Sequence, residues 1–138
     1  MTVTRYAIGF LCVLPLATTV SAAPPASLIE GYAAAAKAEG SGFAGFSAAR
    51  GETLHRTEFA GGKPDTPACT SCHGKDARGP GKTRTGKAIE PMAASASPAR
   101  YQDPAKVEKW FKRNCNEVLG RECTPREKGD WLAYMAGQ

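Results

Sequence analysis

The sequence predicts an all-α domain with substantial loops. Three stretches begin with residues that cap helices, and apolar residues recur at three- and four-residue steps within them. The segments between these stretches are rich in glycine and proline, and no internal repeat is present. At 138 residues the chain has room for one small domain.

The first helix is predicted over residues 26–39. Ser27 and Glu30 have the spacing of a capping box, and Gly40 follows as a stop signal. A second helix is predicted over residues 47–59, with Gly51 near its middle. Glycine inside a helix costs about 1 kcal/mol relative to alanine, so Gly51 indicates a close approach of another element.

A C-x-x-C-H motif, residues 69–73, follows a turn-rich segment. Two thiols at this spacing can add to the two vinyl groups of one porphyrin, and the next residue, a histidine, can then bind the iron. The motif therefore predicts one covalently bound haem c, held by Cys69 and Cys72, with His73 as the proximal ligand.

Two other interpretations of the motif are possible. Cys69 and Cys72 could form half of a zinc site completed by Cys115 and Cys123, or they could be a thioredoxin-like redox pair. Residues 116–122 separate the second pair of cysteines more widely than is usual for zinc ligands. A redox pair favours a βαβ setting, which the surrounding sequence does not indicate.

The C-terminal part of the chain predicts a long loop and two helices. Residues 74–98 have few large apolar side chains and would wrap the edge of the haem. Asp103 and Pro104 begin a helix that ends near Leu119, before Gly120. The last helix begins at Thr124, which forms a capping box with Glu127, and carries three apolar residues on one face: Trp131, Leu132 and Met135.

Asn114 breaks the apolar stripe of the helix over residues 104–119. The other members of this stripe are Val107, Trp110, Phe111 and Val118. A buried amide needs a partner, so Asn114 either bonds a backbone group in the core or interacts with the haem iron or an iron-bound gas. Asn116 is predicted on the opposite, charged face.

Three other residues compete with Asn114 for the iron. Met92 lies in the loop where an electron-transfer cytochrome could place a thioether ligand. Met135 is better explained by packing. His55 is the only other histidine, but it lies on the second helix, whose inner face is otherwise small.

Residues 1–23 have the pattern of a secretory signal peptide. Arg5 supplies positive charge, residues 6–17 are apolar but too short to span a bilayer, and residues 20–23 are small. We therefore expect a domain of residues 24–138 that is exported to the periplasm and not embedded in the membrane. Removal of Cys12 leaves four cysteines, and the pair outside the haem motif, Cys115 and Cys123, could close a short disulfide loop.

The chain has 18 basic and 13 acidic residues. For an exported haem protein this balance suggests an acidic redox partner more than a nucleic acid, although a merely solvated surface would have the same composition. Lys75, Arg78, Lys82, Arg84 and Lys87 follow the haem motif and are candidates for docking a partner or for pairing with haem propionates.

Five segments of the chain resemble the sphaeroides haem protein family, small exported oxygen-binding c-type cytochromes. These segments are residues 62–67, 83–87, 103–110, 113–116 and 120–125, and the similarity runs from about Leu28 to the C-terminus. The resemblance implies a class I cytochrome c-like helical fold wrapped around one covalently attached haem. It also implies His73 as the proximal ligand, Asn114 as an unusual distal ligand and a disulfide between Cys115 and Cys123.

The resemblance implies two further features. In small c-type cytochromes, a glycine such as Gly51 lets the helix before the haem motif cross the C-terminal helix. The family also implies binding of O2, nitric oxide or a similar diatomic, and electron exchange with a partner cytochrome. Met92 departs from the family pattern and leaves open an ordinary electron carrier with His73 and Met92 as ligands.

An enzymatic role is less well supported by the sequence. A haem oxygenase-type or peroxidase-like catalyst usually needs an acid–base pair, and no carboxylate is paired with His55. We therefore expect a ligand-binding or electron-transfer protein, with oxygen- or NO-linked redox activity as an open alternative.

Overall fold

The structure, a computed structural model, describes residues 23–40 and 42–138. These residues form α1 (Ala26–Glu39), α2 (Ala48–Arg56), α3 (Thr70–His73), β1 (Gly81–Lys82), β2 (Ala88–Ile89), a 3-10 helix η1 (Pro98–Tyr101), α4 (Pro104–Leu119) and α5 (Pro125–Ala136). The prediction of an all-α fold is confirmed. The predicted signal peptide, apart from its last residue, and Cys12 lie outside the described residues.

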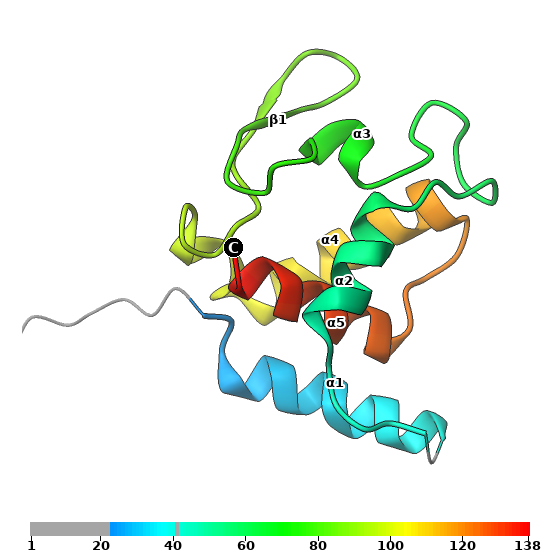
Figure 1. Ribbon diagram of the computed structural model, residues 1–138, viewed down its shortest axis with the longest axis vertical. Helices are drawn as coiled ribbons and strands as arrows, with labels where there is room; N and C mark the ends of the chain where they lie inside the picture. The colour runs from blue at the N-terminus through cyan, green and yellow to red at the C-terminus, as the bar shows by residue number, and fades with distance from the viewer. Residues whose placement is uncertain (1–22, 41) are drawn as a thin grey trace, which may run out of the picture.

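The helix α5 lies near the centre of the molecule. In Figure 1 it is crossed by α2 and flanked by α1 on one side, while α3 and the β1 segment lie at the end of the molecule opposite α1. The segment that carries the C-x-x-C-H motif is therefore placed over one end of a helical scaffold.

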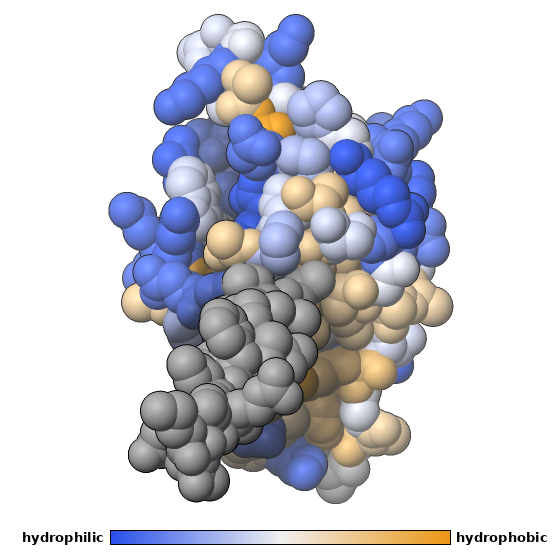
Figure 2. All heavy atoms as spheres, turned by 90° about the vertical axis from the view of Figure 1, so that its left-hand side faces the viewer, coloured by the Kyte–Doolittle hydropathy of each residue, from blue (hydrophilic) through white to orange (hydrophobic). Residues whose placement is uncertain are grey.

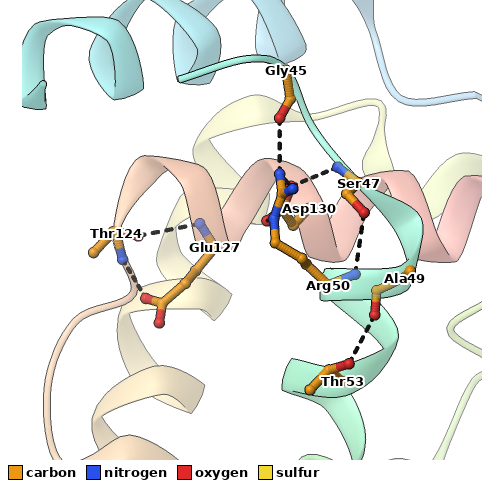
Figure 3. Close-up of polar contacts among 8 residues, drawn as sticks. All are labelled: Gly45, Ser47, Ala49, Arg50, Thr53, Thr124, Glu127 and Asp130. Atoms are coloured by element: carbon orange, nitrogen blue, oxygen red, sulfur yellow. Dashed lines mark hydrogen bonds and ion pairs between the residues drawn. The ribbon is translucent and has the colours of Figure 1, made fainter. Parts of the chain in front are cut away.

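The crossing of α2 and α5 depends on Gly51. This glycine is buried, and a Cβ atom built on it would overlap the backbone oxygen of Asp130. The Asp130 carboxylate also accepts hydrogen bonds from the backbone N–H of Ser47 at 2.7 Å and from the Arg50 guanidinium at 2.7 and 2.8 Å (Figure 3). The predicted close approach at Gly51 is confirmed, and Asp130 fixes the N-terminal end of α2 onto α5.

Two apolar clusters form the core. The larger one surrounds α5, where Leu132 and Met135 are completely buried beside Trp131, Tyr101 and Val107. The smaller one contains Val118 and Leu119 next to the disulfide between Cys115 and Cys123. The apolar face predicted for the last helix is confirmed.

The two C-terminal helices begin where their capping residues predict. The side chain of Asp103 accepts a hydrogen bond from the N–H of Lys106 at 3.1 Å. Thr124 and Glu127 form the reciprocal bonds of a capping box, shown in Figure 3. Gly120 ends α4 with a φ of 73°, a left-handed conformation that glycine adopts without strain.

Four local predictions were wrong. Ser27 does not cap α1, because the carbonyl of Pro25 accepts the first bonds, from Leu28 and Ile29, and Ser27 lies inside the helix. The helix α2 ends at Arg56, since the next residue is extended. Trp110, assigned to the buried stripe, is 43% exposed.

The fourth wrong prediction concerns the segment after the haem motif, which contains a short hairpin. Gly81 pairs with Ile89 and Lys82 with Ala88 in an antiparallel register. Two-residue strands are too short to produce an alternating apolar pattern, so periodicity could not predict them.

Candidate functional site

The C-x-x-C-H motif forms a single helical turn. Cys69 precedes α3, and its carbonyl accepts hydrogen bonds from the N–H groups of Cys72 at 3.3 Å and His73 at 3.0 Å. Both thiols are free and partly buried. The turn therefore brings the two thiols and the imidazole onto one short, ordered segment.

His73 has the properties of a metal ligand. Its Nδ1 atom is buried and has no hydrogen-bond partner among the described residues. Burial lowers the pKa of the imidazole to about 4, so the ring is neutral at physiological pH. A neutral, buried imidazole without a polar partner suits coordination to a haem iron.

The alternatives to haem do not fit this site. Cys115 and Cys123 are joined in a disulfide, with their Cα atoms 5.5 Å apart, so they cannot complete a zinc site with Cys69 and Cys72. Burial raises the pKa of the Cys69 thiol to about 11, which disfavours the thiolate that zinc and redox chemistry require. No group of three or more candidate metal-ligating side chains occurs among residues 23–40 and 42–138.

The two asparagines of α4 differ as their helical positions predict. Asn116 is exposed, and its side-chain amide donates to the carbonyl of Lys112 at 2.6 Å. Asn114 is partly buried, and no hydrogen bond within the described residues involves its side chain. Asn114 therefore has no hydrogen-bond partner within residues 23–40 and 42–138, and its role as a distal ligand stays a prediction.

Met92 and Met135 both lie in the larger apolar cluster. The carbonyl oxygen of Met92 accepts a hydrogen bond from the buried hydroxyl of Tyr101, and its N–H donates to the carbonyl of Ala77 at 2.9 Å. Packing explains both methionines, and iron ligation by Met92 stays an untested alternative.

His55 is completely buried and has a hydrogen-bond partner on each ring nitrogen. Its Nδ1 atom contacts the Trp131 indole nitrogen at 3.3 Å, and its Nε2 atom contacts the carbonyl oxygen of Gly74 at 3.3 Å. These contacts leave neither nitrogen available to bind iron. Sequence reasoning missed them, although the four-residue step from Gly51 to His55 placed this histidine on the face that packs against α5.

The cations predicted near the haem lie on the exposed segment after α3. All five are exposed, and Arg84 forms an ion pair with Asp65 at 2.7 Å. The other four, Lys75, Arg78, Lys82 and Lys87, form no ion pair with another described residue. In the space-filling view of Figure 2, hydrophilic residues also predominate at the top of the molecule, the end away from α1. None of the described helices is long and apolar enough to cross a membrane.

Comparison with known proteins places the chain among cytochromes. Residues 41–135 match the family described as a domain of unknown function, DUF1924. The chain is 55% identical to cytochrome c-type protein SHP of Cereibacter sphaeroides over 114 residues. These aligned residues cover 83% of this chain and 84% of that protein. It is 42% identical to cytochrome c'' of Methylophilus methylotrophus over 69 residues, 49% of this chain and 48% of that protein.

The fold leads to the same proteins. The solved structure of oxidised SHP, described as an oxygen-binding cytochrome c, matches with a TM-score of 0.76 and 54% identity, over 84% of this chain and 98% of that one. Oxidised cytochrome c'' matches with a TM-score of 0.72 and 31% identity, over 81% of this chain and 92% of that one. The chain therefore belongs to the DUF1924 family and, with SHP, to the c-type cytochromes that carry one covalently bound haem c.

Proposed function

We propose that this protein is a periplasmic monohaem cytochrome that binds O2, nitric oxide or a similar diatomic at a site controlled by Asn114. The observation that carries this proposal is the Asn114 side chain, which lies on the inner face of α4 without a hydrogen-bond partner among the described residues. Residues 1–23 would be the signal peptide and residues 24–138 the haem domain. The similarity to SHP, an oxygen-binding cytochrome c, supports the same choice of ligand class.

Four side chains would hold the haem. Cys69 and Cys72 would form the thioether bonds, His73 would bind the iron on the proximal side, and Asn114 would bind it on the distal side. The haem supplies an iron that changes oxidation state and, when ferrous, binds neutral diatomic gases.

Asn114 would act as a ligand that depends on oxidation state. An amide oxygen is a hard donor, which suits ferric iron better than the softer ferrous iron. Asn114 would therefore leave the iron on reduction, and its NH2 group could then donate a hydrogen bond to a gas at the vacated position. The neighbouring disulfide at Cys115 would restrain the part of α4 that carries this residue.

A partner cytochrome would supply or accept the electron. Four exposed cations follow the haem motif and have no ion-pair partner in the part of the chain that the structure describes: Lys75, Arg78, Lys82 and Lys87. They would attract an acidic surface. Such a contact would be weakened by salt, because exposed charges are screened over about 10 Å at 0.1 M ionic strength.

The optical spectrum of the ferrous holoprotein tests the proposal. Under argon we expect a high-spin spectrum that changes at once when carbon monoxide is added, because the sixth position is open. A sharp low-spin ferrous spectrum that carbon monoxide does not alter would contradict the proposal. It would instead support an electron carrier in which Met92 is a permanent ligand.

A further inference from the structure

The tautomer of His55 is fixed by its two neighbours. The indole nitrogen of Trp131 can only donate a hydrogen bond, so His55 Nδ1 must accept it and carries no proton. The neutral ring therefore has its proton on Nε2, which donates to the carbonyl oxygen of Gly74 at 3.3 Å. Burial lowers the pKa of His55, which keeps the ring in this neutral form.

These two bonds connect α5, through α2, to the residue that follows His73. Gly74 ends α3 with a φ of 71°, and its N–H donates to the carbonyl of Thr70 at 3.0 Å. Its own carbonyl faces His55. The rings of Trp131 and Tyr134 lie near His55, with centroid distances of 6.2 and 5.8 Å, so the imidazole also packs against two aromatic side chains of α5.

In the part of the chain that the structure describes, no other hydrogen bond joins residues 69–74 to α2 or α5. The other hydrogen bonds of residues 69–74 all stay within residues 68–74. The bond between His55 and Gly74 is thus the hydrogen bond that joins the C-x-x-C-H turn to the crossed helices α2 and α5.

We propose that His55 is a positioning residue of the haem site. Held by Trp131, it fixes the carbonyl of Gly74 and, through it, the direction in which the His73 imidazole meets the iron. This inference rests on the proposed function, because it takes His73 as the proximal ligand. A change at His55 would alter the bond between His73 and iron without removing any ligand.

The test compares variants of the ferrous holoprotein by resonance Raman spectroscopy of the iron–imidazole stretching band. His55→Phe keeps an aromatic ring beside Trp131 and Tyr134 but loses both hydrogen bonds. We expect this variant to shift and broaden the band. We also expect it to change the dissociation constant for carbon monoxide by about two- to tenfold, the range that one hydrogen bond can contribute.

Two further variants separate positioning from packing. His55→Gln can both donate to Gly74 and accept from Trp131, so it should return the band toward its wild-type position. Trp131→Phe should shift the band in the same sense as His55→Phe, by a smaller amount. Leu54→Ala, which removes a partly buried neighbour in α2, should lower thermal stability and leave the band unchanged.

Two results would overturn the inference in different ways. A wild-type iron–imidazole band that His55→Phe does not move would show that His55 only stabilises the fold, while the proposed function would stand. Absence of the band from the wild-type ferrous protein would contradict His73 ligation with an open sixth site, and the positioning role would fail together with the proposed function.

Discussion

The α-carbon of Gly51 in α2 lies so close to the backbone oxygen of Asp130 in α5 that a Cβ atom cannot be accommodated between them. Both partners of this contact belong to helix backbones, which cannot rotate away as a flexible side chain could. The separation of α2 from α5 is therefore set by the absence of a side chain at residue 51.

Gly51→Ala should destabilise the protein by about 1–3 kcal/mol, the usual cost of overpacking a core. Gly31→Ala is the matched control, because a Cβ at that position would meet no side chain and no other element within 4 Å. The control should increase stability by about 0.5–1 kcal/mol, since alanine favours helix. Urea unfolding of both variants measures the two free energies, and equal effects would contradict the close-contact argument.

Asp130→Ala should cost about 1–3 kcal/mol, because it leaves the backbone N–H of Ser47 without its acceptor. The ion pair with Arg50 adds little, since the Arg50 side chain is 53% exposed. Glu52→Ala, which breaks an exposed pair with Arg56, serves as the control and should change stability by less than about 0.5 kcal/mol. The denaturant midpoints of the two variants measure the two losses of stability. Equal losses would contradict the view that the buried carboxylate of Asp130 contributes more than an exposed one.

Replacing both Cys115 and Cys123 with serine should lower stability by about 2–3 kcal/mol in the chain-entropy treatment of a short loop. The loss should disappear when wild-type and variant proteins are compared under strong reducing conditions. A persistent difference there would mean that the serines disturb the smaller core cluster directly.

Acid should weaken the junction between α4 and α5. The Glu127 carboxylate accepts from Arg121 at 2.7 and 2.8 Å and from the N–H of Thr124 at 2.8 Å, and these bonds lower its pKa below the ordinary value of 4.5. A lowered pKa in the folded state means that this stability is present above pH 4.5 and is lost as the pH falls through the folded pKa. The effect is moderate, because Arg121 is half exposed.

Glu127→Gln checks this pH dependence. The amide oxygen can still accept from Thr124, but the side chain no longer titrates, so the variant should lose less stability than the wild type between pH 5 and pH 3. Thermal unfolding at a series of pH values makes the comparison, and parallel curves would exclude Glu127 as the titrating group.

Asn114→Ala should leave the ferric haem five-coordinate or bound to water, because the proposed distal ligand is removed. The ferric optical and electron paramagnetic resonance spectra report this change. Asn116→Ala alters an exposed side chain on the same helix and should leave both spectra as in the wild type. An unchanged ferric spectrum in Asn114→Ala would rule out this residue as a ligand.

Local signals in the sequence predicted most of the fold. Asp103 and Thr124 act on helices that follow them directly, so their capping bonds could be predicted without knowledge of the tertiary structure. The capping box predicted at Ser27 is absent because α1 begins earlier, after Pro25, whose side chain forms no capping hydrogen bond. The C-x-x-C-H motif is equally local, which is why the haem attachment segment was evident.

Contacts between distant segments were less predictable. The bonds of His55 to Trp131 and Gly74 join residues 76 and 19 positions away in the chain. Periodicity shows which face of a helix is buried, but it does not show which side chain of another helix lies opposite. Asn114 was identified because an amide on an apolar stripe is an exception to the pattern, whereas the exposure of Trp110 depends on what packs beside α4.

The disulfide between Cys115 and Cys123 also bears on how the protein matures. Four cysteines can pair in three ways, and two of those pairings would join the haem motif to Cys115 and Cys123. Cys115 and Cys123 are only eight residues apart in the chain, and the end of α4 and the turn after it bring them together. Early closure of this local loop would leave Cys69 and Cys72 as the one pair of free thiols among the described residues, so neither could be lost to a disulfide with Cys115 or Cys123 before haem attachment.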